Sequence, residues 1–161
     1  MKSKHPHPNW DDTLGINDIA LLVLEEELDF NEFVGPIELP SGDENFTGYA
    51  TTSGWGFLKD GKHEKSHDTL LKTTIPLVSS KDCSSDYKDY FEVKYEPVSM
   101  ICAGIKGKSP CRGDSGGPLI CGSKLCGIVS WIPDCGSAIY PGVFTRVTTY
   151  IDFIKSLSST P

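Results

Sequence analysis

The sequence has no apolar run long enough to cross a membrane and no run of lysine or arginine that would form a basic patch. Its longest apolar stretch, residues 19–24, has the length of one strand. The formal net charge is -7 at pH 7, and an acidic chain without clustered basic residues does not attract phosphate backbones. We therefore expect neither a membrane nor a nucleic acid as a partner.

The chain also lacks a Cys-x-x-Cys pair, which disfavours a zinc site, so no metal or other cofactor is expected. Its six cysteines, at positions 83, 102, 111, 121, 126 and 135, form an even set in the C-terminal half. Such a set predicts disulfides and an oxidising compartment, although a reduced intracellular protein with buried thiols remains the alternative. Asn45, in Asn-Phe-Thr, is a candidate glycosylation site and fits a secreted protein.

The first residues lack the apolar core of a signal peptide. A disulfide-bonded protein without an export signal is inconsistent. We therefore expect either that the beginning of the chain is missing or that the cysteines are not paired.

Short apolar runs broken by Gly, Pro, Asn, Asp and Ser predict a mostly β protein of a length that suits one domain. The expected strands are 19–24, 49–54, 70–77, 99–103, 117–121, 125–131 and 143–147. Near the end of the chain, Val147, Tyr150, Ile151, Ile154 and Leu157 recur at helical spacing. Many strands with one terminal amphipathic helix indicate an antiparallel barrel or sandwich.

The stretch CRGDSGGPL, residues 111–119, is too rich in glycine for a regular helix or strand. A serine hydroxyl becomes a useful nucleophile when a base removes its proton and nearby N–H groups stabilise the oxyanion. Gly113 can adopt backbone conformations that let its N–H and that of Ser115 face one point. The loop predicts a nucleophile at Ser115 with an oxyanion hole formed by Gly113 and Ser115, and a plain glycine-serine turn is the competing interpretation.

GDSGGP in this loop resembles the nucleophile signature of the trypsin- and chymotrypsin-like serine endopeptidases. Other segments resemble the same family in the same order: NDIALLVL at 17–24, TSGWG at 52–56, MICAG at 100–104, GIVSW at 127–131 and YPGVFTRV at 140–147. The resemblance covers nearly all of the chain. It implies an all-β fold of two antiparallel β-barrels, with the second barrel complete, the first partial, and a C-terminal α-helix.

The resemblance further implies a single partial protease domain over residues 1–161. Residues 1–40 would be a remnant of the first barrel and the inter-barrel linker, 41–146 the second barrel, and 147–158 the terminal helix. The chain would then be the C-terminal two-thirds of a protease domain, beginning at an internal methionine.

By the same resemblance, Ser115 is the nucleophile and Asp18 is the carboxylate that orients the base and stabilises its cation. Taken alone, an Asn-Asp pair before a strand favours a turn or capping aspartate, and only the other family-like segments favour the catalytic role. Ser130 resembles the residue that supports Asp18 and begins the strand along the substrate. Asp114 resembles the carboxylate that pairs with the new N-terminal amino group of the activated enzyme.

The family's catalytic histidine lies upstream of the Asp18 segment in an AAHC-like string, which this sequence does not contain. We expect His5, His7, His63 and His67 to be solvated surface residues. Without a base, the chain is expected to be inactive as it stands. Asp114 would also lack its amino-terminal partner, and a buried carboxylate without one tends to protonate or turn outward, so a poorly formed oxyanion hole is expected.

The resemblance assigns the substrate-binding residues as Ser109, Pro110, Arg112, Ser130, Trp131, Ile132 and Gly142. An aspartate in place of Ser109 would attract Arg or Lys, so a trypsin-like preference is not expected. Pro110 should reshape the pocket floor, Ile132 should narrow the entrance, and Gly142 should leave the opposite side open. The implied preference is apolar, elastase-like ahead of chymotrypsin-like.

The resemblance also implies the disulfides Cys83–Cys102 and Cys111–Cys135. The usual partner of Cys121 is expected to be replaced by Thr73. Because Cys126 faces Cys121 across a predicted hairpin, the pair Cys121–Cys126 is expected, with free thiols as the alternative.

The leading hypothesis is a secreted serine endopeptidase that hydrolyses peptide bonds through an acyl-enzyme, with protein or peptide substrates and with protein inhibitors as further candidate partners. The alternative is a catalytically dead homologue that acts as a protein-binding module. The presence of both Ser115 and Asp18 favours the enzyme.

Overall fold

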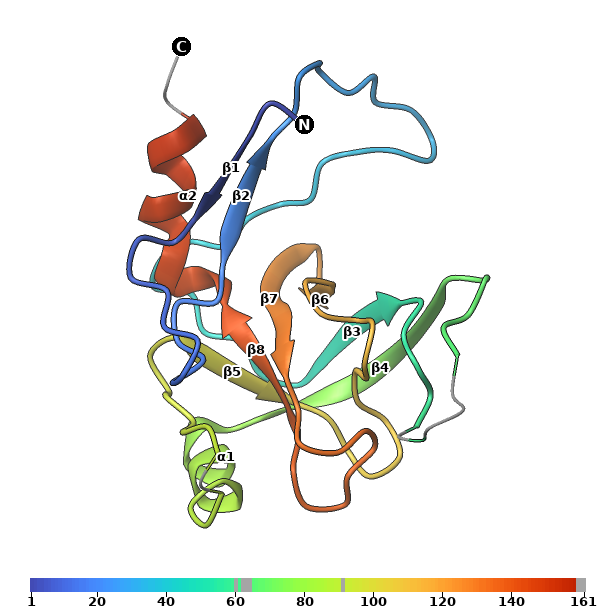
Figure 1. The fold of residues 1–161 in the computed structure, drawn as a ribbon, viewed down its shortest axis with the longest axis vertical. Helices are drawn as coiled ribbons and strands as arrows, with labels where there is room; N and C mark the ends of the chain where they lie inside the picture. Colours follow the sequence, from blue (N-terminus) through green and yellow to red (C-terminus); the bar gives the residue numbers. More distant parts are fainter. Residues whose placement is uncertain (60, 62–64, 91, 159–161) are drawn as a thin grey trace.

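A closed antiparallel barrel of six strands dominates the computed structural model, which describes residues 1–59, 61, 65–90 and 92–158 (Figure 1). The strands are β3 (Tyr49–Gly54), β4 (Leu71–Val78), β5 (Met100–Ala103), β6 (Pro118–Cys121), β7 (Lys124–Trp131) and β8 (Gly142–Arg146). They neighbour one another in the order β3-β4-β5-β8-β7-β6, and β6 pairs with β3 to close the barrel.

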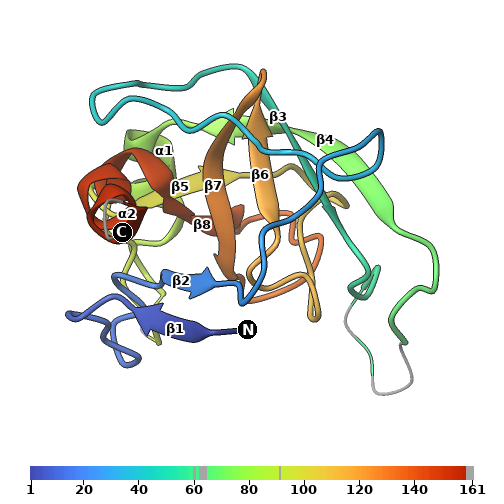
Figure 2. The ribbon, with the colours of Figure 1, turned by 90° about the horizontal axis from the view of Figure 1, so that it is seen from above.

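A second, two-stranded antiparallel sheet joins β1 (Ser3–Pro6) to β2 (Ala20–Val23). It lies beside the terminal helix in the two views of Figures 1 and 2. Apolar side chains on β2 and on the loop after it remain exposed, with Leu22 at 62% and Phe33 at 86%. The predicted fold is confirmed: all-β, with one complete barrel, a partial first barrel and a C-terminal helix.

The barrel interior is filled by side chains that alternate along the strands, because successive residues of a strand point to opposite faces. Ala50, Ile75, Ile101, Leu119 and Phe144 are all buried there and pack in one cluster. Full burial of an Ile, Leu or Phe side chain contributes about 1.5–3 kcal/mol. This core includes residues of β6 and β7. The loop of Ser115 leads into β6, and the loop of Ile132 follows β7.

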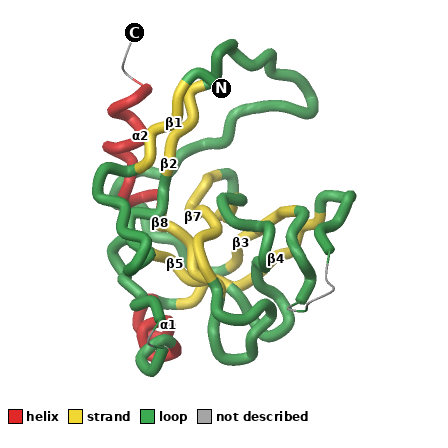
Figure 3. The backbone as a smooth tube through the Cα atoms, viewed as in Figure 1, coloured by secondary structure: helices red, strands yellow, loops and turns green. Residues whose placement is uncertain are grey.

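Two short helical segments flank the barrel, and Figure 3 shows how little of the chain is helical. The helix α1 (Ser80–Asp86) begins at Ser79, whose hydroxyl accepts a hydrogen bond from the N–H of Asp82. The C-terminal segment forms one 3-10 turn, η1 (Val147–Tyr150), and then α2 (Ile151–Ser158). No helix in the described residues is long and apolar enough to span a membrane.

The structure contains disulfides between Cys83 and Cys102, between Cys111 and Cys135, and between Cys121 and Cys126. The expectation about Thr73 was wrong. Thr73 lies on β4, where it pairs with Thr52, whereas the neighbour of β6 is β3. The register between β3 and β6 places Ala50, not Thr73, beside Cys121. The prediction chose β4 as the neighbour of β6, whereas the barrel closes by pairing β6 with β3.

Candidate active site

Asp18 lies two residues before β2 and is held there by side chains of the barrel. Its carboxylate accepts a hydrogen bond of 2.6 Å from the hydroxyl of Ser130, at the end of β7. Its backbone carbonyl accepts a bond of 2.7 Å from the hydroxyl of Thr145, on β8. The side chain is half-buried, so these bonds fix its position while one face remains accessible.

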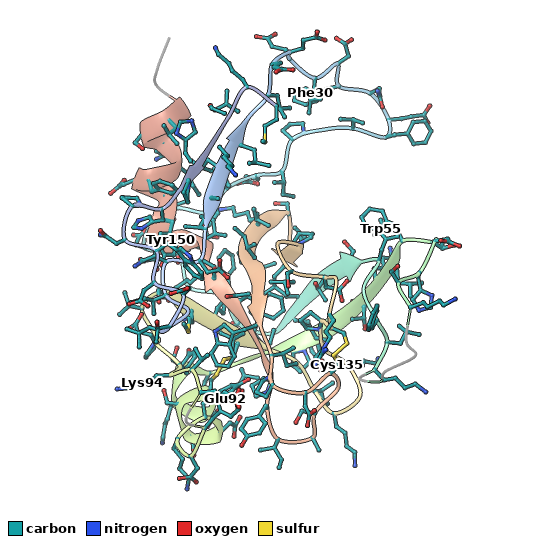
Figure 4. The ribbon with its side chains drawn as sticks, in the orientation of Figure 1. Phe30, Trp55, Glu92, Lys94, Cys135 and Tyr150 are labelled. Carbon is teal, nitrogen blue, oxygen red and sulfur yellow. A yellow bond between two sulfur atoms is a disulfide. The ribbon has the colours of Figure 1, made fainter. Side chains whose placement is uncertain are left out.

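Asn17 sets the backbone immediately before Asp18. It has a φ of 57°, the left-handed region that asparagine tolerates better than most residues. Its side chain donates to the carbonyl of Asn9 at 2.7 Å and accepts from the hydroxyl of Tyr150 at 3.1 Å. Figure 4 shows Tyr150 where the terminal helix meets the N-terminal segment. Neither Asn17 nor Tyr150 was predicted as a site residue, although the Asn-Asp pair marked the turn.

The nucleophile loop is attached to the same strand as Ser130. The N–H of Gly116 donates to the carbonyl of Val129 at 2.9 Å, and the N–H of Val129 donates to the carbonyl of Gly117 at 2.8 Å. Val129 directly precedes Ser130, which contacts Asp18. The strand β7 is therefore bonded both to the loop of Ser115, which is exposed, and, through Ser130, to the Asp18 carboxylate.

The backbone at Gly113 and Ser115 is bent by two turns. The N–H of Asp114 donates to the carbonyl of Cys111 at 3.0 Å, and the N–H of Gly117 donates to that of Asp114 at 2.8 Å. Gly113 has a φ of 94°, which side chains strongly disfavour. Within the described ranges, the N–H groups of Gly113 and Ser115 donate to no other group, so both are available to an external acceptor.

The carboxylate of Asp114 is half-buried beside the end of β3, so it does not turn outward, which was one of the two outcomes expected without a cationic partner. It accepts hydrogen bonds from the N–H of Gly56 at 2.8 Å and from the N–H of Cys111 at 2.9 Å. Backbone donors stabilise a partly buried carboxylate without any cation. The loop is thereby fixed to the end of β3.

A cavity of about 270 Å³ opens next to Asp114, between β3, β4 and the loop 107–110. Its wall includes Gly54, Gly56, Thr73 and Ser109 in addition to Asp114. Of the residues expected in the substrate pocket, Ser109 and Pro110 line it, and the others do not: Arg112, Ser130, Trp131, Ile132 and Gly142.

Several of the expected pocket residues contact one another around the loop 107–110. Ser109 donates to the carbonyl of Pro110 at 3.1 Å, and its hydroxyl accepts from the N–H of Gly136 at 2.7 Å. Gly142, at the start of β8, is buried against Pro110, since a Cβ there would lie 2.9 Å from the proline Cδ. Ile132 is half-buried on the loop after β7, and Arg112 is exposed.

Trp131 packs into an aromatic cluster with Tyr87 and Tyr90. Its ring lies edge-on to Tyr87, with centroids 5.0 Å apart, and stacks with Tyr90 at 6.1 Å. Tyr87 donates to the carbonyl of Pro141, and burial raises the pKa of the Tyr87 hydroxyl. The cluster ties α1 to the segment that leads into Gly142, so Trp131 is a packed residue as well as a candidate wall residue.

Comparison with known proteins agrees with this geometry, because residues 1–154 match the family model described as Trypsin. The chain belongs to the trypsin family. It is 43% identical over 158 residues to Trypsin-1 of Astacus astacus, covering 93% of this chain and 63% of that protein. It is 38% identical over 162 residues to Trypsin 5G1 of Aedes aegypti, covering 98% of this chain and 59% of that protein.

The chain is also 39% identical over 163 residues to the Venom serine protease Bi-VSP of Bombus ignitus. That match covers 94% of this chain and 44% of the relative. The chain thus spans less than two thirds of the length of each of these relatives.

The histidines of this trypsin-family chain lie in separate surroundings. His5 on β1 has its Nε2 2.8 Å from the hydroxyl of Ser3. The ring of His7 packs against Phe153 and Tyr150, with centroids 4.8 and 5.4 Å apart, and its Nδ1 accepts from the N–H of Asn9. His67 donates its backbone N–H to Trp55, and His63 lies outside the described residues. Among the described histidines, none has a hydrogen bond to Asp18 or Ser115.

Proposed function

We propose that the complete protein is a serine endopeptidase in which Ser115 attacks the peptide carbonyl and Asp18 orients a histidine base. The observation that carries this proposal is the attachment of both residues to β7: Ser130 bonds the Asp18 carboxylate, and Val129 bonds the nucleophile loop. Membership of the trypsin family supports the same assignment.

The proposed reaction proceeds in two stages. In the first, the base accepts the proton of the Ser115 hydroxyl while the oxygen bonds to the carbonyl carbon, and the departing amine takes that proton as the C–N bond breaks. In the second, the base activates water, which releases the acid and restores the hydroxyl. The Asp18 carboxylate orients the base and stabilises the transient imidazolium.

The oxyanion of each stage would be bound by the N–H groups of Gly113 and Ser115. Their freedom from other partners among the described groups supports this role. Two fixed N–H donors stabilise a developing oxyanion because they need no reorganisation at the moment of reaction, and loss of one costs about 2.7–4 kcal/mol in a well-formed hole.

The histidine base would come from residues outside this sequence. The described histidines support this, because His5 bonds Ser3, His7 packs on the aromatic rings near α2, and none of the three has a hydrogen bond to Asp18 or Ser115. We therefore propose that the 161-residue chain alone is inactive. The cavity beside Asp114 would receive the N-terminal amino group of the activated enzyme, whose charge would then join the two backbone donors on this carboxylate.

The proposed preference at the residue before the scissile bond is apolar, for small or medium aliphatic side chains. Ser109 carries no charge, and its hydroxyl already bonds Pro110 and Gly136, so it offers little to a lysine or arginine. The packing of Gly142 on Pro110 and the branched Ile132 at the entrance support a shallow pocket. A methylene changes discrimination by about 1–3 kcal/mol only.

We also propose that the protein works outside the cell on protein or peptide substrates. The three disulfides support this location, since such bonds persist in oxidising compartments.

The test is peptide hydrolysis by the activated full-length protein and by its Ser115→Ala variant. Matched peptides carry Ala, Val, Phe or Arg before the scissile bond. The proposal expects turnover that S115A abolishes, ranked Ala and Val above Phe and well above Arg. Equal turnover by S115A would refute the nucleophile, and Arg as the best substrate would refute the preference.

A further inference from the structure

Asn45 lies on the loop that leads into β3, between two anchored neighbours. On one side, the ammonium of Lys124 donates to the Glu44 carboxylate at 2.9 and 3.1 Å. On the other side, the Phe46 ring packs against the barrel core. The loop therefore holds the intervening Asn45 side chain in one direction.

That direction is toward solvent. Asn45 and Thr47 are exposed, whereas Glu44 and Phe46 are half-buried. In the described part of the chain, no hydrogen bond involves the side chain of Asn45 or Thr47. Asn45-Phe46-Thr47 is also the sole Asn-x-Ser/Thr sequence in the chain, so a single position carries the pattern and the fold leaves its reactive amide unoccupied.

We propose that Asn45 carries an N-linked glycan, an inference that rests on the extracellular location proposed above. In this step the Asn45 amide nitrogen forms a bond to the anomeric carbon of an N-acetylhexosamine. The bond from that carbon to the diphosphate of a polyprenyl-linked oligosaccharide breaks, and the polyprenyl diphosphate leaves as the amide gives up one proton. The Thr47 hydroxyl, two residues on, is the part of the acceptor that the transferase requires.

The folded chain has room for the sugar. Asn45 forms part of the wall of a surface hollow of about 360 Å³ that also includes Pro97, Val98 and Thr149. Val98 is 67% exposed, so the first sugar, attached to the Asn45 amide, would cover an apolar side chain.

The glycan would also leave the catalytic side open. The loop of Asn45 is fixed through Glu44 to Lys124, at the turn between β6 and β7. Ser115 precedes the opposite end of β6, which spans four residues, or about 13 Å. A glycan at Asn45 therefore marks the far end of the barrel, and its removal should leave peptide hydrolysis unchanged.

The test expresses the full chain behind a cleavable export signal in a eukaryotic secretory system, with Asn45→Gln, Thr47→Ala and Thr47→Ser as matched variants. The readout is the mass of the chain before and after peptide amidase treatment, which converts a glycosylated asparagine to aspartate. We expect one glycan on the wild type and on T47S, none on N45Q or T47A, and aspartate at position 45 after deglycosylation.

The disulfide state of each sample distinguishes a chain that did not reach the secretory compartment from one that reached it and was not glycosylated. A wild-type chain with its cysteines oxidised but without sugar would overturn the proposal, because that chain has passed through the compartment where the transferase acts. The result does not depend on proteolysis, so loss of the proposed peptidase activity would leave the glycan assignment intact, and absence of the glycan would leave the peptidase assignment intact.

Discussion

The hydroxyl of Ser130 and the carboxylate of Asp18 lie 2.6 Å apart, and this hydrogen bond joins segments separated by 112 residues. It connects β7, which is hydrogen-bonded to the loop of Ser115, to the residue proposed to orient the base. Hydrogen bonds to a carboxylate are shorter and stronger than those between neutral groups.

We predict that Ser130→Ala lowers kcat/KM of the activated full-length enzyme by about 10- to 150-fold, the equivalent of about 1.5–3 kcal/mol. Most of the loss should be in kcat, because the hydroxyl positions Asp18. Ser123→Ala is the control. Ser123 lies on the exposed turn after β6 and donates to the Glu38 carboxylate. Loss of the Ser123 hydroxyl should leave kcat unchanged. An S130A enzyme with full kcat would mean that the bond has no catalytic effect.

The position of Asp114 depends on Gly56, and this gives a second prediction. A Cβ at Gly56 would lie 2.5 Å from the Asp114 carboxyl carbon, so Gly56→Ala forces the carboxylate out of its site. We expect a loss of about 1–3 kcal/mol in the free energy of unfolding, as for other overpacked sites, measured by denaturant titration. Gly35→Ala meets no atom within 4 Å and should change stability by less than about 0.5 kcal/mol. Equal effects of the two variants would contradict this account.

Glu96 should make stability pH-dependent. Burial opposes ionisation of its carboxyl, but hydrogen bonds from Ser99 and from the N–H of Val98, with Arg146 nearby, outweigh burial and lower the pKa below its usual value. A lowered pKa in the folded state means that the stabilisation is fully present above the unfolded pKa of a carboxyl group. It is lost as pH falls through the folded pKa.

We therefore predict that Glu96→Gln destabilises the chain by about 1–2 kcal/mol at neutral pH. The difference from wild type should shrink as the pH falls below about 4.3, the unfolded value. Denaturant titrations at a series of pH values measure this. A constant E96Q difference down to the acid limit would refute the prediction.

The disulfides should differ in their contribution to stability. Cys121–Cys126 encloses a separation of 5 residues, whereas Cys83–Cys102 encloses 19. In the chain-entropy description, these separations correspond to roughly 2 and roughly 3 kcal/mol. We expect the double Cys→Ala variant at 121 and 126 to lose about 1 kcal/mol less than the one at 83 and 102, by denaturant titration. The reverse order would show that packing, not chain entropy, dominates.

Much of the fold could be predicted from the sequence, because the barrel strands are short apolar runs with clear turn residues between them. The range 49–54 agrees with β3, and the other barrel strands agree to within one residue at every end. The strand β1 was missed because Ser3–Pro6 is polar and ends in proline, so only its pairing with β2 makes it a strand. The helix α1 was missed although Ser79 and Asp82 carry its N-terminal capping signal.

Site residues that lie in a local sequence motif could be predicted, whereas contacts that the fold makes between distant segments could not. Ser115 and Asp18 follow from local strings that resemble the family. The bonds of Asn17 to Tyr150 and of Gly56 to Asp114 join positions 133 and 58 residues apart, and no local pattern encodes such contacts. The inward position of Asp114 was missed for the same reason.

The measurement closest to the central claim is labelling by a fluorophosphonate, which reacts with an activated serine. It compares the 161-residue chain, the activated full-length protein that contains the upstream segment, and the Ser115→Ala form of that protein. We predict rapid modification of Ser115 in the full-length protein alone, with no label on the short chain or on the alanine form. Rapid labelling of the short chain, or an unlabelled Ser115 in a folded, activated full-length protein, would contradict the assignment of Ser115 as a nucleophile that depends on a base from outside this sequence.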